Sequence, residues 1–191
     1  MNNGKESRSA DEAVRALMAR YADTWRLLLE YDEDRLEIPE EAPQSRTTLD
    51  DEGVVTDIEK FKRFLATRGQ SSALFGNLRG DALQGILGSI EQTMFGQPLY
   101  RSREEKAAHL LYFLIKDHPF VDGNKRIGSL LFLLYMQREG MTHRLNPQAL
   151  TTLALLVAES APGRKDLMTR LVANLLMEPV STNTGLPSDP P

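Results

Sequence analysis

Two strongly apolar helical segments, separated by one short polar loop, limit the fold of this chain more than any other feature. The first begins at the capping box Ser102 to Glu105 and ends at His118-Pro119, because proline disfavours helical geometry in the residue before it. The second begins at Asn124 and ends at Gly140. Apolar residues cover nearly every face of both segments, so both must be buried. The sequence therefore predicts two central helices joined by a polar loop.

Other segments with helical periodicity surround this pair. An amphipathic helix is expected from Asp11 to about Glu30, with an apolar face of Val14, Leu17, Met18, Tyr21, Trp25, Leu28 and Leu29. Further helices are expected after the capping box at Thr56, over about 81–94, after Asn146-Pro147, and from Pro162-Gly163 to about Met177. Phe95 to Arg101 breaks this spacing and suits a small hairpin. The fold class is all-α with little β structure.

The distribution of prolines and acids divides the chain into three parts. Residues 1–55 comprise the N-terminal helix and a long connection, expected to be partly mobile because Pro39, Pro43 and many acids leave little to bury. Residues 56–178 form the core. The tail 179–191 is rich in proline and poor in apolar residues, so it is expected to be disordered.

Composition excludes several classes of protein. Without cysteine, the chain has no disulfide framework, thiolate zinc site or cysteine nucleophile. No segment approaches the roughly 20 apolar residues of a membrane helix, and the start lacks a signal-peptide pattern. With 23 basic and 27 acidic residues, the charge of −4 gives no broad field for nucleic acid. A cytoplasmic protein without membrane or general nucleic-acid binding is expected.

The loop between the central helices concentrates polar groups. Lys125 and Arg126 fall in the first turn of a helix, where the macrodipole disfavours cations unless an anion is nearby. Gly123 lets a ligand approach the backbone, and Asn124 adds an amide donor. This combination predicts an anion site suited to a polyphosphate.

Two further residues complete a group-transfer site. Asp122 offers one hard oxygen, and Mg²⁺ is often held by one or two carboxylates together with substrate phosphates. His118 is suited to take a proton from an attacking hydroxyl near neutral pH. Transfer from a nucleotide such as ATP needs little more than this positioning and charge stabilisation.

The nine residues HPFVDGNKR, His118 to Arg126, resemble the Fic/Doc signature H-x-F-x-D/E-G-N-G/K-R. The resemblance implies a Fic-like helical bundle with a β-hairpin flap, using ATP and Mg²⁺. It extends from about Leu74 to Leu176, which looks like the Fic-type C-terminal portion of RhuM-like virulence proteins. The resemblance implies that His118 is the base, that Phe120 anchors the loop and that Asp122 binds magnesium. It also implies that Gly123 and Asn124 form the anion hole and that Arg126 contacts the nucleotide phosphates.

By the same resemblance, the flap would pair with an extended segment of a target protein through Pro98, Leu99 and Tyr100. AMP-transferring members usually have glycine in place of Lys125 and an arginine in place of Ser129. Members with N-K-R are similar to Doc-like kinases. The resemblance thus implies either AMPylation or phosphorylation of a protein hydroxyl, and Lys125 favours the latter.

An inhibitory string of the family, S/T-x-x-x-E-G/N, matches Thr48 to Gly53 and would make Glu52 inhibitory, although this region has weak helical signal. Two other functions stay open: a metal-dependent phosphohydrolase, and a module that binds nucleotide or a partner without catalysis. The target protein, the oligomeric state and any antitoxin or inhibitory partner are not determined by the sequence.

Overall fold

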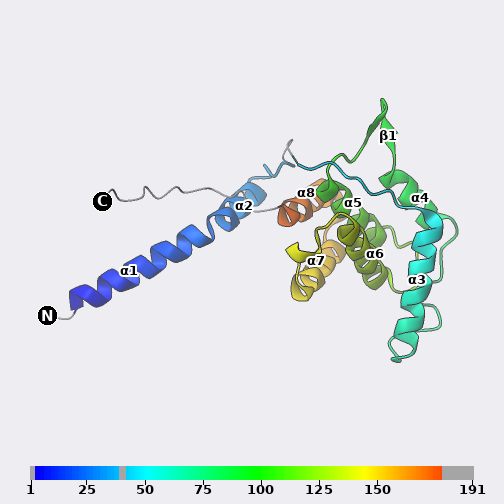
Figure 1. The fold of residues 1–191 in the computed structure, drawn as a ribbon, viewed down its shortest axis with the longest axis horizontal. Helices are drawn as coiled ribbons and strands as arrows, with labels where there is room; N and C mark the ends of the chain where they lie inside the picture. The colour runs from blue at the N-terminus through cyan, green and yellow to red at the C-terminus, as the bar shows by residue number, and fades with distance from the viewer. Residues whose placement is uncertain (1–2, 39–41, 178–191) are drawn as a thin grey trace, which may run out of the picture.

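The structure is a computed structural model that describes residues 3–38 and 42–177, with side chains from Glu12 onward. It confirms the predicted all-α class with one small hairpin (Figure 1). The hairpin pairs β1 (Thr93–Met94) with β2 (Gln97–Pro98). The helices are α1 (Asn3–Arg20), α2 (Ala22–Asp32), α3 (Asp51–Ala66), α4 (Ala82–Ile90), α5 (Arg103–Lys116), α6 (Asn124–Arg138), α7 (Pro147–Glu159) and α8 (Lys165–Leu176).

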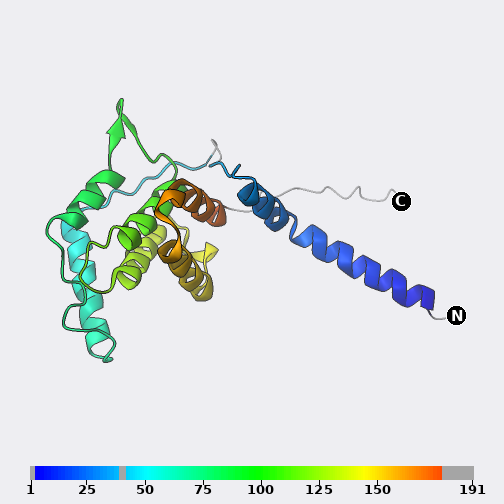
Figure 2. The same ribbon diagram turned by 180° about the vertical axis from the view of Figure 1, so that it is seen from behind.

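Helix α5 is the centre of the core, as its all-round apolar character predicted. It packs against α4, α6, α7 and α8 (Figures 1 and 2). The Ser102 hydroxyl accepts a hydrogen bond from the Glu105 amide at 3.0 Å, which confirms Ser102 as the cap, while the Glu105 carboxylate accepts from the Arg101 amide at 3.1 Å. Leu110, Leu111 and Leu114 are fully buried. Because α5 and α6 are fixed on several sides, the loop between them has rigid ends.

Two helix boundaries differ from the expectation. Helix α3 begins at Asp51, ahead of the Thr56 capping box, because the Asp50 carboxylate accepts a hydrogen bond from the Gly53 amide at 2.6 Å. The expected helix over 11–30 is divided at Tyr21 into α1 and α2. The Asn146-Pro147 start of α7 is confirmed, since Asn146 accepts a bond from the Ala149 amide at 2.8 Å.

The described part of the connection before α3, residues 42–50, is held against the core. The Glu139 carboxylate accepts a hydrogen bond from the Thr47 amide at 2.7 Å, and Lys106 Nζ donates to the Thr47 carbonyl at 2.8 Å. Leu49 is buried. Residues 42–50 thus contact the core through partners distant in sequence, which the sequence did not indicate. The tail over 179–191, which was expected to be disordered, lies outside the described residues, which end at Met177.

The hairpin ends in a two-residue turn at Phe95 and Gly96, both with positive φ, of 52° and 77°. Such a turn matches the twist of paired strands but usually contains Asn-Gly or Gly-Gly. Here the Phe95 side chain stands at the tip and is 98% exposed. None of the described helices is long and apolar enough to cross a membrane.

Candidate active site

The loop that joins α5 to α6 is held along its length by a distant segment, residues 75–79, which we call the strap. The Gly76 amide donates to the Asp122 carbonyl at 3.0 Å, and the Arg79 amide donates to the Pro119 carbonyl at 2.9 Å. In the other direction, the Val121 amide donates to the strap at 2.8 Å. These backbone bonds fix the course of the loop independently of its side chains.

Gly123 precedes the first residue of α6 and touches the strap. Its φ is 95°, in the left-handed region that favours glycine. A Cβ atom at this position would lie 2.4 Å from Phe75 Cε2, which is far inside van der Waals contact. Both the backbone conformation and the close approach of the Phe75 ring therefore require glycine.

The Asn124 side chain closes the loop on itself. Its Oδ1 accepts a hydrogen bond from the Phe120 amide, and its Nδ2 donates to the Phe120 carbonyl, both at 2.9 Å. Phe120 is completely buried, which fits its expected role as an anchor. The sequence predicted Asn124 as a donor to an anion, whereas here its amide hydrogen bond holds the loop and its backbone amide starts α6.

Asp122 and Arg126 lie side by side at the rim of the site. The Ser72 hydroxyl donates to Asp122 Oδ2 at 2.7 Å, and Arg126 Nη2 lies 3.7 Å from Asp122 Oδ1. Arg126 Nη1 donates to the Gln70 carbonyl at 2.5 Å, and its guanidinium carbon lies 4.4 Å from the Phe75 ring centroid. Both charged side chains are about two-fifths exposed, so the pair adds little stability and mainly orients its members.

A polar cavity of about 330 Å³ forms over this loop and the start of α6. The cavity brings together all the predicted loop residues: His118, Asp122, Gly123, Asn124, Lys125 and Arg126. The first backbone amides of a helix have no acceptor within it and carry partial positive charge. His118 lines this cavity and is exposed. Its backbone has a φ of 49°, in the left-handed region. A helix amino end, a carboxylate and an imidazole therefore border one space.

A second cavity, of about 380 Å³, adjoins the first and shares Lys125 and Arg126 with it. Its other walls are mostly apolar and include Phe61 of α3, Leu133 of α6 and Leu155 of α7. This space could not be predicted from the sequence, because its walls come from three helices whose apolar residues each suggest ordinary core.

The predicted flap residues separate in the structure. Pro98 belongs to β2, and the Leu99 amide donates to the Gln92 carbonyl at 2.8 Å, which continues the hairpin. Tyr100 instead packs inward, with its ring stacked on His109 of α5 at a centroid distance of 3.9 Å. Pro98 and Leu99 thus stay with the hairpin, while the Tyr100 ring is engaged with the core.

Glu52 does not lie near the motif arginine. Asp57, five residues further along α3, pairs with Arg138 at 3.6 Å, at the C-terminal end of α6. Arg126 is in the first turn of α6, and the fifteen residues of this helix span about 22 Å. Phe61, further along α3, lines a cavity together with Lys125 and Arg126 at the amino end of α6. Helix α3 therefore runs antiparallel to α6 and carries Glu52 away from Arg126, which corrects the inhibitory assignment in this conformation.

Sequence reasoning missed the supports of the site: Gln70, Ser72 and the strap. They fall between two helices in a stretch without periodicity, and no motif marks them. Among the described residues, no three His, Asp or Glu side chains gather into a metal-binding group. A phosphohydrolase with several protein ligands to its metals would need such a group.

Comparison with known proteins gives one match. Residues 51–136 match the model of the Fic/DOC family, over α3 to α6 including the loop, the strap and the hairpin. This match supports a Fic-type domain. No curated protein and no solved structure matches the chain, so the resemblance to RhuM-like virulence proteins stays a prediction.

Proposed function

We propose, on the premise that residues 51–136 form a Fic-type domain, that this chain transfers a phosphate-containing group from ATP to a protein hydroxyl. The observation that carries the proposal is the polar cavity, which brings together His118, Asp122 and the amino end of α6. Transfer of this kind depends on positioning and on stabilising charge at phosphorus oxygens. No covalent enzyme intermediate is needed.

His118 is the proposed general base. Its position at the start of the loop, with a left-handed backbone, sets its ring at the cavity edge next to incoming substrate. It takes the proton of a target Ser, Thr or Tyr hydroxyl as that oxygen forms a bond to phosphorus. The bond to the leaving group breaks in the same displacement, releasing pyrophosphate if AMP is transferred or ADP if phosphate is transferred.

The amino end of α6 is the proposed phosphate site. Orphan amides and two cations, Lys125 and Arg126, offer positive charge on the cavity wall. Arg126 is already aligned by the Gln70 carbonyl and the Phe75 ring, so less side-chain entropy is lost when it contacts a phosphate oxygen.

The donor set at Asp122 fits magnesium that arrives with a nucleotide. One carboxylate faces the cavity, and the Ser72 hydroxyl orients it. A single protein carboxylate suffices for Mg²⁺ where substrate phosphates and waters complete the octahedron. When bound, the ion would neutralise developing charge on the phosphates.

Lys125 favours phosphoryl transfer over AMP transfer. Its side chain lines both the polar and the apolar cavity, in the place where AMP-transferring relatives of this signature have glycine. The added bulk and charge oppose the arrangement that those members use. We therefore favour a Doc-like kinase, with AMPylation as the alternative reaction at the same site.

The test is to incubate the protein and a lysate with Mg²⁺ and ATP labelled separately at the α and γ phosphates. Label from γ alone on proteins identifies phosphorylation, and label from α alone identifies AMPylation. His118→Ala should abolish either signal, whereas His143→Ala, which alters an exposed histidine in the turn Thr142–Arg144, should not. Retention of protein labelling in His118→Ala would refute the assigned role.

Binding of ATP without label transfer would instead favour a non-catalytic binding module. Release of nucleotide or phosphate without protein labelling would favour the hydrolase. Either outcome, obtained with a chain whose fold is verified by circular dichroism, would remove the transferase proposal.

A further inference from the structure

The two N-terminal helices expose a continuous apolar face that the core does not cover. At about 100° per residue, its members fall within an arc of roughly 120°, the width of a helix face that normally packs against a partner. Each of these side chains is between 42% and 59% exposed. We call this surface the α1–α2 face; it comprises Val14, Leu17, Met18, Tyr21, Trp25, Leu28 and Leu29.

The division at Tyr21 does not interrupt this face. The Tyr21 amide donates to the Leu17 carbonyl at 3.2 Å, and the Trp25 amide donates to the Tyr21 carbonyl at 3.0 Å. These are the i to i−4 bonds of a helix, so the helical rotation carries through the junction. Figures 1 and 2 show α1 and α2 nearly end to end, as one rod.

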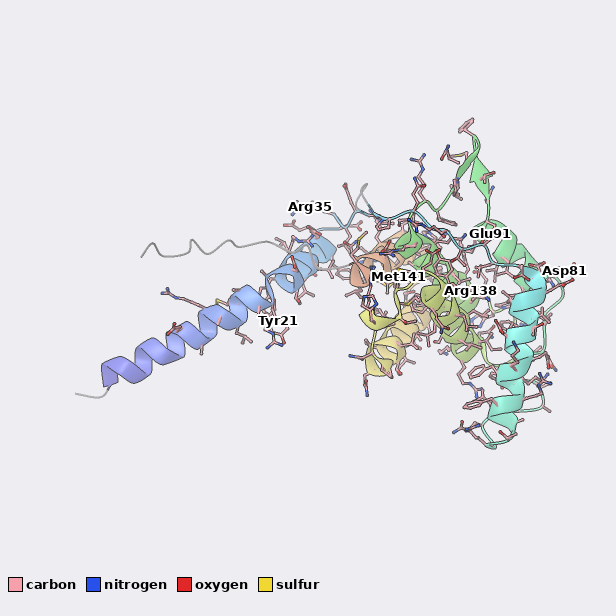
Figure 3. The ribbon with its side chains drawn as sticks, viewed as in Figure 1. Tyr21, Arg35, Asp81, Glu91, Arg138 and Met141 are labelled. Atoms are coloured by element: carbon pink, nitrogen blue, oxygen red, sulfur yellow. The ribbon has the colours of Figure 1, made fainter. Side chains whose placement is uncertain are left out.

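The opposite side of this rod is already in use. Leu27 and Tyr31 of α2 pack against the core, where α2 contacts α8. Beyond α2, Leu36 is fully buried and its carbonyl accepts a bond from Arg170 at 3.0 Å. The rod is thus anchored at one end and projects from the body, with Tyr21 far from the central helices (Figure 3).

We propose that the α1–α2 face binds the same face of a second copy of this chain, with the two rods antiparallel. From the exposed fractions and the sizes of these side chains, the face offers on the order of 700 Å² of apolar surface per chain. A standard stable interface buries about 800 Å² per partner. Five of the residues, Val14, Met18, Tyr21, Trp25 and Leu28, alternate by four and three, the spacing of a paired helical seam.

Charge along the rod favours the antiparallel arrangement. Among the described side chains, residues 12–21 carry Glu12, Arg15 and Arg20, a net charge of +1, whereas residues 22–32 carry Asp23, Arg26, Glu30 and Asp32, a net charge of −2. A parallel pair would place like charges opposite one another, which is unfavourable. An antiparallel pair centred between Tyr21 and Ala22 places Met18 opposite Trp25 and brings the net-positive half of one rod alongside the net-negative half of the other.

The residues that follow the described part of the chain match this face poorly. Residues 178–191 contain Val180 and Leu186 as their large apolar residues, too few to match seven. The inference is independent of the proposed catalytic function.

The single tryptophan makes the interface measurable. Trp25 should shift its fluorescence emission to shorter wavelength as the protein is concentrated, while the mass doubles from 21.5 kDa to about 43 kDa by light scattering. Met18→Asp, opposite Trp25 in the pair, should raise the dissociation constant about a hundred-fold, because a charge would be buried without a partner. Ala16→Asp, on the other side of α1, is the matched control and should leave association unchanged.

Crosslinking tests the direction, since the chain has no cysteine. Chains with Val14→Cys mixed with chains with Leu29→Cys should form mixed disulfide dimers, and Val14→Cys alone should form few. A crosslink within Val14→Cys alone would overturn the antiparallel arrangement.

Three results would overturn the interface itself. One is a monomer at all concentrations up to the millimolar range. Another is a dimer that Met18→Asp leaves unchanged, with folding verified by circular dichroism. The third is a Trp25 shift caused by anionic lipid vesicles and not by concentration, which would assign the face to a membrane surface.

Discussion

Replacing Gly123 with alanine tests whether the strap and the loop form one packed unit. The substitution places a methyl group 2.4 Å from Phe75 Cε2 and 2.6 Å from Phe75 Cδ2, so it would overlap a ring that is fully buried. A non-glycine residue in the left-handed region costs about 1–2 kcal/mol. Overpacking of a buried contact costs about 1–3 kcal/mol. A small gain from the stiffer unfolded chain offsets part of this, so we expect a loss of about 2–4 kcal/mol in the free energy of unfolding.

Gly80 supplies the matched control. Its φ of 57° is also positive, but a Cβ there would meet nothing within 4 Å. Gly80→Ala should therefore cost only the backbone part, about 1 kcal/mol. The difference between the two variants, measured by urea unfolding followed by far-UV circular dichroism, isolates the contact with Phe75.

A double-mutant cycle completes this experiment. Phe75→Leu shortens the ring that the new methyl group would strike, so Gly123→Ala should cost at least about 1 kcal/mol less in that background. Equal costs for Gly123→Ala and Gly80→Ala, or strict additivity with Phe75→Leu, would refute the close contact. A variant that keeps its stability but loses activity would show that Gly123 serves the ligand and not the packing.

Three other changes probe different supports of the site and fold. Ser72→Ala should raise the Mg²⁺ concentration needed for half-maximal activity by about ten-fold, because Asp122 loses the hydroxyl that orients it; an unchanged requirement would argue against Asp122 as a magnesium ligand. Phe95→Asn should raise the unfolding midpoint slightly, since Asn suits a left-handed turn position, while protein labelling falls if the exposed ring contacts the target; ATP binding by calorimetry serves as the control. Burial lowers the pKa of His109 to about 4 from its usual 6.5, so the unfolded chain binds the extra proton and stability should fall by up to about 3 kcal/mol as pH drops from 6.5 to 4. His109→Phe should flatten that acid-dependent loss, which unfolding curves at several pH values would reveal.

The parts of the fold that follow from local chemistry were predicted from the sequence. His118-Pro119 ends α5 after Lys116, and Gly123 precedes α6, because proline and glycine act on their own backbone neighbours. The capping residues Ser102 and Asn146 were found for the same reason. Where two possible helix caps lie close together, however, local chemistry does not decide between them: α3 begins after the Asp50 cap and not at the Thr56 capping box.

What the sequence could not predict depends on partners far along the chain. The strap residues 75–79 pair with a loop more than forty positions later, and no pattern in their own sequence indicates this pairing. The side chain of Asn124 was interpreted as a donor to a ligand. In the structure it is hydrogen-bonded to the backbone of Phe120, and the motif does not reveal this pairing. The direction of α3 relative to α6 decided the position of Glu52, and helix direction in space is a property of packing.

The strap also has a dynamic consequence for the site. The loop is held by backbone hydrogen bonds to residues 75–79 and by the two hydrogen bonds between the Asn124 side chain and Phe120. It can therefore open only if several of these interactions break together. Amides of Gly76, Arg79 and Val121 should therefore exchange with solvent slowly although they lie in irregular segments. On the cavity wall, motion is then left mainly to the exposed side chains of Lys125 and Arg126, whose rotations are fast.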